Sequence, residues 1–144
     1  MTAKYTPDNI TKLGPNEIFT FGSNTAGRHG KGAARQAYHN FGAVYGVGEG
    51  LMGQSYAFPT LDGNFSQRTE VELVESIRAL YQCCVDNPGL TFFLTRVGCG
   101  LAGLSDTYMK ELFHAPVLFL GAQGPPKNIV WPEGWGPAYE NASI

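Results

Sequence analysis

The segment from residue 18 to residue 36 constrains the fold of this chain more than any other. Its first four residues, Ile18–Phe21, form a β-branched and aromatic run that is typical of a buried strand. Glycines follow at positions 22, 27, 30 and 32, and an alanine-rich helix is predicted to begin near Gly32 or Ala33. Glycines let main-chain N–H groups approach a ligand closely, and a helix N-terminus favours negative charge. The segment therefore predicts an anion site, with phosphate as the first candidate.

Strands and helices are predicted to alternate along the rest of the chain. The helix over residues 69–85 is the clearest, because Thr69 and Glu72 form a capping box and apolar residues recur at helical spacing, from Val74 to Val85. The predicted helices are 33–41, 69–85 and 105–113. The predicted strands are 18–21, 55–60 (ended by Pro59), 90–97, 118–120 at an edge, and 128–131. Residues 42–54 are predicted to be a loop, and an irregular arm is predicted to begin at about residue 132. This alternation predicts a single α/β domain over residues 1–144 with a mostly parallel sheet.

Charge and cysteine content exclude several classes of function. The formal net charge of −2 argues against a broad nucleic-acid-binding surface, which requires a basic excess. The three cysteines form no C-x-x-C motif, so we expect neither a zinc site nor a disulfide framework. We also expect no metal and no cofactor. Cys99 is interpreted as a small packing residue. Residues 1–7 lack the apolar core of a signal peptide, and no stretch is long enough to span a membrane, which favours a cytoplasmic protein without a membrane partner.

Two standard phosphate-binding motifs do not fit the glycine loops. A Walker A loop needs Lys and Ser or Thr where this chain has Arg28 and His29. Residues 98–103 have the G-x-G-x-x-G spacing of a dinucleotide-binding loop. However, residues 115–132 lack the acidic residue with which such a site holds the ribose.

Both glycine loops, at residues 22–34 and 98–103, follow predicted strands and precede predicted helices. Loops at the carboxyl ends of parallel strands meet at one edge of an open α/β sheet, where ligands bind. Two phosphate-binding loops at one edge predict a ligand with a diphosphate, or with a phosphate beside a ribose.

Several stretches resemble the macro domain family. They are D-N-I-T-K-L at 8–13, the strand ending in G-S-N at 22–24, the turn at 30–34, and T-R-V-G-C-G-L-A-G at 95–103. More narrowly, F-G-S-N, G-R-H-G and R-V-G-C-G-L-A-G resemble a macro-like group of short bacterial and phage proteins. The resemblance covers most of residues 8–113. It implies a three-layer α/β/α domain with a mostly parallel, mixed sheet that binds ADP-ribose or a derivative.

The resemblance also implies roles by position. Asp8 or Asn9 would face the adenine amine, Asn24 would meet the distal ribose, and Tyr139 or Phe58 would stack on the adenine. The two glycine loops would hold the diphosphate, and the full expected ligand set is Asp8, Asn9, Gly22, Ser23, Asn24, Arg28, Gly30, Lys31, Gly32, Ala33, Gly98, Cys99, Gly100, Leu101, Ala102 and Gly103.

Candidate catalytic groups are few. A water molecule positioned by Asn24, with His29 or Glu49 as the base, would be the nucleophile of a hydrolase. Arg28 and Lys31 would supply positive charge to a phosphate. Family members that hydrolyse ADP-ribose esters often carry an Asp after the glycines, and no acidic residue occurs between residues 24 and 36. This departure counts against hydrolysis by that route and adds weight to simple binding.

Three functional hypotheses remain open at this stage. The first, which is preferred, is a protein that binds ADP-ribose or a related NAD-derived nucleotide and hydrolyses an ADP-ribosyl or terminal phosphate linkage. The second is a non-catalytic module that sequesters or senses such a nucleotide. The third is a virion or host-interaction protein that keeps the fold without a ligand. The expected partner in the first two is a small-molecule nucleotide or a macromolecule that carries ADP-ribose.

Overall fold

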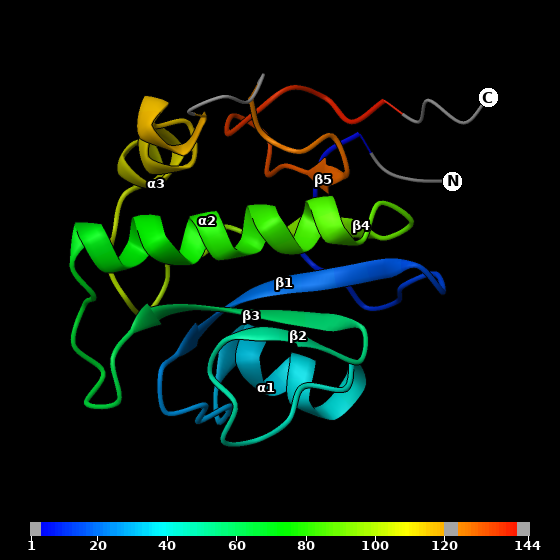
Figure 1. Cartoon of the computed structure of the whole chain (residues 1–144). Coiled ribbons are helices and arrows are strands. Elements are labelled where there is room, and N and C mark those ends of the chain that lie inside the picture. Colours follow the sequence, from blue (N-terminus) through cyan, green and yellow to red (C-terminus); the bar gives the residue numbers. More distant parts are fainter. Residues whose placement is uncertain (1–3, 120–123, 141–144) are drawn as a thin grey trace.

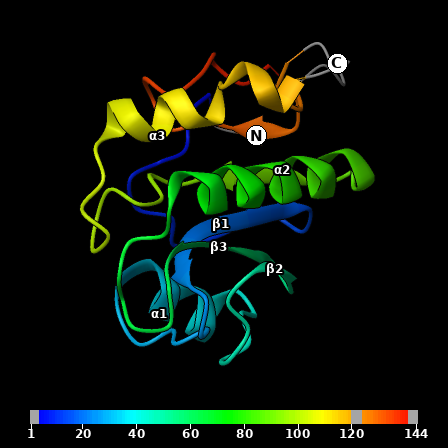
Figure 2. The same ribbon diagram turned by 60° about the vertical axis from the view of Figure 1, so that its left-hand side comes forward.

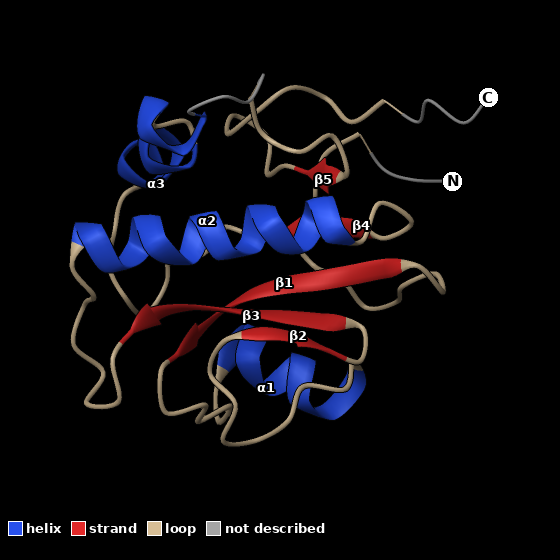
Figure 3. Ribbon diagram, in the orientation of Figure 1, coloured by secondary structure: helices blue, strands red, loops and turns tan. Residues whose placement is uncertain are grey.

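The computed structural model describes residues 4–119 and 124–140 (Figure 1). Its elements in chain order are β1 (Glu17–Asn24), α1 (Gly32–Asn40), β2 (Gly50–Met52), β3 (Ser55–Leu61), α2 (Glu70–Asp86), β4 (Thr91–Leu94), α3 (Asp106–Phe113), a 3₁₀ turn η1 (Pro116–Phe119) and β5 (Ile129–Val130). Figure 3 shows the alternation of strands and helices along the chain. The α/β fold predicted from the sequence is confirmed.

The sheet is mixed and has the strand order β2-β3-β1-β4-β5. β1 is central and pairs in parallel with β3 on one side and β4 on the other. β4 pairs in parallel with β5, whereas β2 is antiparallel to β3. The predicted parallel character therefore holds for every strand pair except the one at the β2 edge.

The strands are apolar on both faces, because successive side chains of a strand point to opposite sides of the sheet. Ile18 and Phe92 belong to one buried cluster, to which α2 and α3 also contribute. Their neighbours Phe19 and Phe93 belong to a second buried cluster, which includes Ala37 of α1. Figures 1 and 2 show α1 on the opposite side of the sheet from α2. Burial on both faces explains the nearly continuous apolar runs of the central strands.

Helix α2 has the N-terminus that the sequence predicts. The Thr69 side chain accepts a hydrogen bond from the Glu72 N–H, and the Glu72 carboxylate accepts one from the Thr69 N–H, which confirms the capping box. Val85 was expected in the buried stripe, but it is 63% exposed because it lies on the outer side of the last turn. In the described part of the chain, no helix combines the length and the apolar character that crossing a bilayer requires.

Four strand predictions need correction. β4 ends at Leu94, so residues 95–97 of the predicted strand 90–97 belong to the loop that follows it. Residues 50–52, expected to be loop, form the short edge strand β2. Pro59 lies inside β3 rather than at its end, and the β1–β3 register shifts just after the Ser23–Pro59 pair. A proline offers no N–H to the ladder, so a register shift is a common accompaniment. Residues 118 and 119, expected in a strand, belong to η1, and the third residue of that prediction lies outside the described residues.

The chain leaves the neighbouring strands β1 and β4 toward opposite faces of the sheet. β1 leads to α1, which packs in one cluster, and β4 leads to α3, which packs in the other. Such a divergence between adjacent parallel strands opens a crevice at their carboxyl ends, and ligands of open α/β sheets bind there. Both glycine-rich loops flank this crevice.

Candidate functional site

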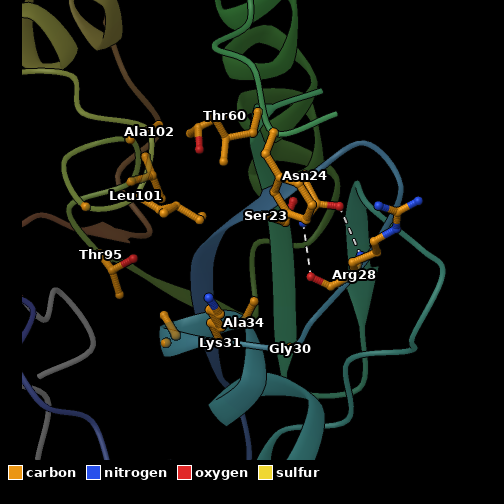
Figure 4. Close-up of a pocket in the computed structure, with 18 of the residues that line it drawn as sticks. Ser23, Asn24, Arg28, Gly30, Lys31, Ala34, Thr60, Thr95, Leu101 and Ala102 are labelled. Carbon is orange, nitrogen blue, oxygen red and sulfur yellow. Dashed lines mark hydrogen bonds between the residues drawn. The ribbon is translucent and has the colours of Figure 1, made fainter. Parts of the chain in front are cut away.

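A cavity of about 720 Å³ lies at the carboxyl ends of β1, β3 and β4 (Figure 4). Its volume falls within the range of ordinary small-molecule sites, roughly 300–1,000 Å³. The lining residues are Gly22, Ser23, Asn24, Arg28, Gly30, Lys31, Gly32, Ala33, Ala34, Tyr45, Thr60, Leu61, Phe65, Thr95, Arg96, Val97, Gly98, Gly100, Leu101 and Ala102. The β1–α1 loop and the β4–α3 loop therefore face one another across a single cavity, as the sequence predicts.

Twelve residues of the expected ligand set line this cavity: Gly22, Ser23, Asn24, Arg28, Gly30, Lys31, Gly32, Ala33, Gly98, Gly100, Leu101 and Ala102. Four do not, namely Asp8, Asn9, Cys99 and Gly103. Asp8 and Asn9 are exposed on the segment before β1. The position that the resemblance implies for the adenine amine is therefore not part of the cavity.

The N-terminus of α1 forms one wall of the cavity. Its N-cap residue, Lys31, has extended backbone angles and makes no side-chain capping hydrogen bond, and the first turn contains no acidic residue. The first N–H groups of a helix have no partner within the helix, so here they stay free for an external acceptor. A Cβ atom built on Gly30 would meet no atom within 4 Å, which shows that the backbone borders open space.

The β4–α3 loop forms the opposite wall. Hydrogen bonds from the Leu104 N–H to the Gly98 carbonyl (2.8 Å) and from the Gly103 N–H to the Gly100 carbonyl (3.0 Å) fold it into consecutive turns. Gly98 has φ +82°, a conformation that side chains rarely adopt, whereas a Cβ atom on Gly100 would meet nothing within 4 Å. Gln67 donates a hydrogen bond to the Ala102 carbonyl (2.5 Å) and so ties this loop to the segment before α2.

The Asn24 side chain is used within its own loop. Its Nδ2 atom donates to the Arg28 carbonyl and its Oδ1 atom accepts from the Arg28 N–H, both at 3.0 Å (Figure 4). Asn24 is 5% exposed. Each end of the amide makes one hydrogen bond to Arg28, so the side chain shapes the β1–α1 turn. One Nδ2 hydrogen and one Oδ1 lone pair remain beyond these two bonds, and Asn24 lines the cavity.

His29 lies outside the cavity lining, although it was expected beside the phosphate. Its ring is 1% exposed and packs edge-on against Phe21 and Tyr45. The Nε2 atom lies 3.0 Å from the carbonyl oxygens of both Val44 and Val47. Because both partners are acceptors, Nε2 carries the proton and donates. His29 therefore fixes the loop over residues 44–47, and its placement does not support a role as a base.

The glycine-rich segment over residues 42–54 packs closely against the backbone of the β1–α1 loop. A Cβ atom on Gly27 would lie 2.3 Å from the Gly46 backbone, and one on Gly48 would lie 2.3 Å from the Asn24 carbonyl oxygen. Only glycines permit so close an approach of two backbones. Glu49, expected as an alternative base, is exposed and does not line the cavity.

The lining carries positive charge without a carboxylate. Arg28, Lys31 and Arg96 contribute to it, whereas no Asp, Glu or His is among the lining residues. Arg96 is held by Asp106 and donates to the Glu133 carbonyl (2.8 Å). Within residues 4–119 and 124–140, neither Arg28 nor Lys31 forms a salt bridge. The cavity is therefore suited to an anionic ligand.

Three other residues considered in the sequence analysis, Phe58, Tyr139 and Cys99, do not line the cavity and pack in or against the buried clusters. Phe58 is fully buried, with its ring 5.5 Å from that of Phe113, and Tyr139 packs against the cluster beside α1. Burial raises the pKa of the Cys99 thiol to about 11, so the thiol is protonated at neutral pH and is a poor nucleophile. Cys99 packs against the cluster beneath α2, in line with its interpretation as a packing residue.

Eight lining residues were not expected: Ala34, Tyr45, Thr60, Leu61, Phe65, Thr95, Arg96 and Val97. Three of them, residues 60, 61 and 65, lie at or just after the end of β3. Since β3 is parallel to β1, its carboxyl end had to meet the same edge, and the strand pattern over 55–60 was the available signal.

Comparison with known proteins gives no relative: no family model, no curated protein and no solved structure matches this chain. Among the residues that the structure describes, no group of three or more His, Cys, Asp or Glu side chains is placed to hold a metal ion.

Proposed function

We propose that this protein binds ADP-ribose or a closely related NAD-derived nucleotide, on a macro-domain-like, three-layer α/β/α scaffold. The observation that carries the proposal is the pair of glycine-edged turns, residues 30–33 and 98–102, that line one carboxylate-free cavity. A pyrophosphate between these turns would accept hydrogen bonds from main-chain N–H groups on both sides.

Charge and size favour the same class of ligand. Arg28 and Lys31 lie in the lining without a salt-bridge partner among the described residues, so both side chains remain for phosphate oxygens. A cavity of about 720 Å³ has room for a nucleotide rather than for a phosphate ion alone. The apolar lining residues, which include Leu61, Phe65 and Leu101, suit the base and the faces of the sugars.

Binding without hydrolysis is the form of the function that the geometry supports best. General acid or base catalysis needs a titratable group within hydrogen-bond reach of the reacting atoms. The lining offers no Asp, Glu or His. We therefore favour a module that sequesters or recognises the nucleotide, free or attached to a macromolecule, over an ADP-ribosyl hydrolase or phosphatase.

A thermal-shift titration with ADP-ribose, NAD and AMP tests the proposal. A ligand at 100 times its Kd stabilises the folded state by about 2.7 kcal/mol, so the melting temperature should rise with ADP-ribose concentration. No shift at millimolar concentrations of any of the three would contradict the proposal. Incubation with ADP-ribosylated protein should release no free ADP-ribose. Release of ADP-ribose would instead favour the hydrolase over the binding module.

A further inference from the structure

Phe65 has an unusual backbone conformation at the edge of the cavity. Its φ of +61° is the only positive value at a non-glycine residue in the described part of the chain. The Asp62 carboxylate holds the turn by accepting hydrogen bonds from the N–H groups of Asn64 (2.8 Å) and Ser66 (3.0 Å). Bulky residues are rare in this region, and such strain is concentrated at functional sites.

The Phe65 ring is not used for core packing. It is 47% exposed, lines the cavity, and belongs to neither buried cluster. A large apolar ring in a strained turn, half in solvent at the mouth of a cavity, contributes little to the folded state. Its position is explained if a ligand covers the ring.

Arg28 completes the arrangement. Its guanidinium carbon lies 5.8 Å from the centroid of the Phe65 ring, within cation–π distance. The Asn24 amide clamps the Arg28 main chain on both its N–H and its carbonyl, so the side chain starts from a fixed backbone. In the described residues no carboxylate competes for this guanidinium.

We infer that Phe65 is the stacking surface for the aromatic base of the nucleotide, and that the Arg28 guanidinium, which lies against the same ring, binds the phosphate next to the base. The inference rests on the proposed function and adds an orientation to it. The base stacks on Phe65 near the ends of β1 and β3, and the phosphates extend from there toward the N-terminus of α1. This orientation differs from the one that the resemblance implies, because Asp8 and Asn9 lie outside the cavity.

The substitution Phe65→Gly separates a stacking role from a structural one. Glycine adopts a φ of +61° without strain, so this variant should keep its fold and its melting temperature. Loss of one stacked base typically weakens binding by roughly 5- to 150-fold. Isothermal titration of Phe65→Gly should show a loss in this range for ADP-ribose and ADP, and a change of less than about twofold for pyrophosphate, which has no base. Phe65→Trp should retain the affinity, and Asn64→Gly, in the same turn, serves as the matched control.

Each outcome has one meaning. Equal affinity of Phe65→Gly and the wild type for ADP-ribose would overturn the inference and leave the proposed function intact. Equal losses for ADP-ribose and pyrophosphate would also overturn it, because the ring would then only shape the loop. Failure of the wild-type protein to bind ADP-ribose would contradict the proposed function itself.

Discussion

Helices α1 and α3 both begin at the edge of the sheet where the cavity lies, but their N-termini are treated differently. The Ser105 side chain caps α3 by accepting from the Tyr108 N–H, and Asp106 follows in the first turn. Helix α1 begins with Lys31, which makes no capping bond, and has no acidic residue in its first turn. A cap and an acidic residue each stabilise a helix N-terminus. The chain supplies both at α3 and neither at α1.

The difference indicates what each helix start is for. Where the helix serves only the fold, the chain satisfies the free N–H groups with its own side chains. At α1 no side chain caps these groups, glycines lie at positions 30 and 32, and the first residues of the helix line a cavity without carboxylates. The N-terminus of α1 lacks the stabilisation that a cap provides, and in the proposed function a bound anion would supply it.

Filling the cavity should have the largest effect on ligand binding. Gly100→Leu places a side chain where a Cβ atom meets nothing within 4 Å, so the fold should tolerate it while the side chain blocks the ligand. We expect the Kd for ADP-ribose to rise by at least about 100-fold, which corresponds to about 2.8 kcal/mol. Isothermal titration measures this change. Gly89→Leu is the control, because its Cβ would also meet nothing within 4 Å and it lies outside the cavity lining. Unchanged affinity in Gly100→Leu would mean that this turn does not contact the ligand.

Giving α1 a capped N-terminus like that of α3 should raise the stability of the protein and lower its affinity for ADP-ribose. Lys31 already has the extended backbone of an N-cap residue, so Lys31→Asp should cap the helix and stabilise the protein by about 1 kcal/mol. The same change places a carboxylate where the phosphate would lie, and ADP-ribose affinity should fall by roughly tenfold or more. Thermal unfolding and titration report the two effects separately. Lys31→Ser, a cap without negative charge, should be as stable and bind better than Lys31→Asp. A gain in stability without any loss of affinity would mean that the N-terminus of α1 does not contact the ligand.

Removing a cap elsewhere should affect stability alone. Thr69→Ala breaks the capping box of α2 and should cost about 1 kcal/mol in the free energy of unfolding, measured by urea denaturation. Thr69 does not line the cavity, so the Kd for ADP-ribose should not change. A parallel loss of affinity would show that capping at any helix influences the site, and the contrast between the helices would lose its meaning.

The smallest expected effect is a pH dependence. Hydrogen bonds from the Thr69 main chain and side chain hold the pKa of the Glu72 carboxylate below its ordinary value. A folded-state pKa below that of the unfolded chain gives stability that is present above about pH 4.3 and lost as the pH falls through the folded pKa. Glu72→Gln keeps the geometry of the box, so its unfolding free energy should fall less on acidification than that of the wild type. If the unfolding free energies of Glu72→Gln and the wild type change equally with pH, the Glu72 carboxylate makes no such contribution.

Local signals in the sequence account for a large part of the fold and for the two facing loops. The capping box at Thr69 lies within four consecutive residues, and the glycine loops sit between strand and helix patterns, so neighbouring residues suffice to predict them. The edge strand β2 could not be predicted, because its three residues lie in a glycine-rich segment without alternation and are ordered by pairing with β3.

The parts of the site that depend on contacts between distant residues could not be predicted. His29 belongs to a loop that the sequence predicts to face the ligand. Its contacts with the carbonyl groups of Val44 and Val47, which lie 15 and 18 residues further along the chain, could not be predicted. Phe65 looks like an ordinary turn residue until the β1–β3 pairing brings it beside Arg28. Such residues become visible only when segments far apart in the chain are placed together.

The most direct test of the central claim follows the main-chain amides themselves. In an ¹⁵N–¹H correlation spectrum titrated with ADP-ribose, the amide signals of residues 30–33 and of residues 100–102 should shift together, with one common Kd. Pyrophosphate alone should move the same two groups of signals. Shifts confined to one of the loops, or to residues outside the cavity, would contradict the account.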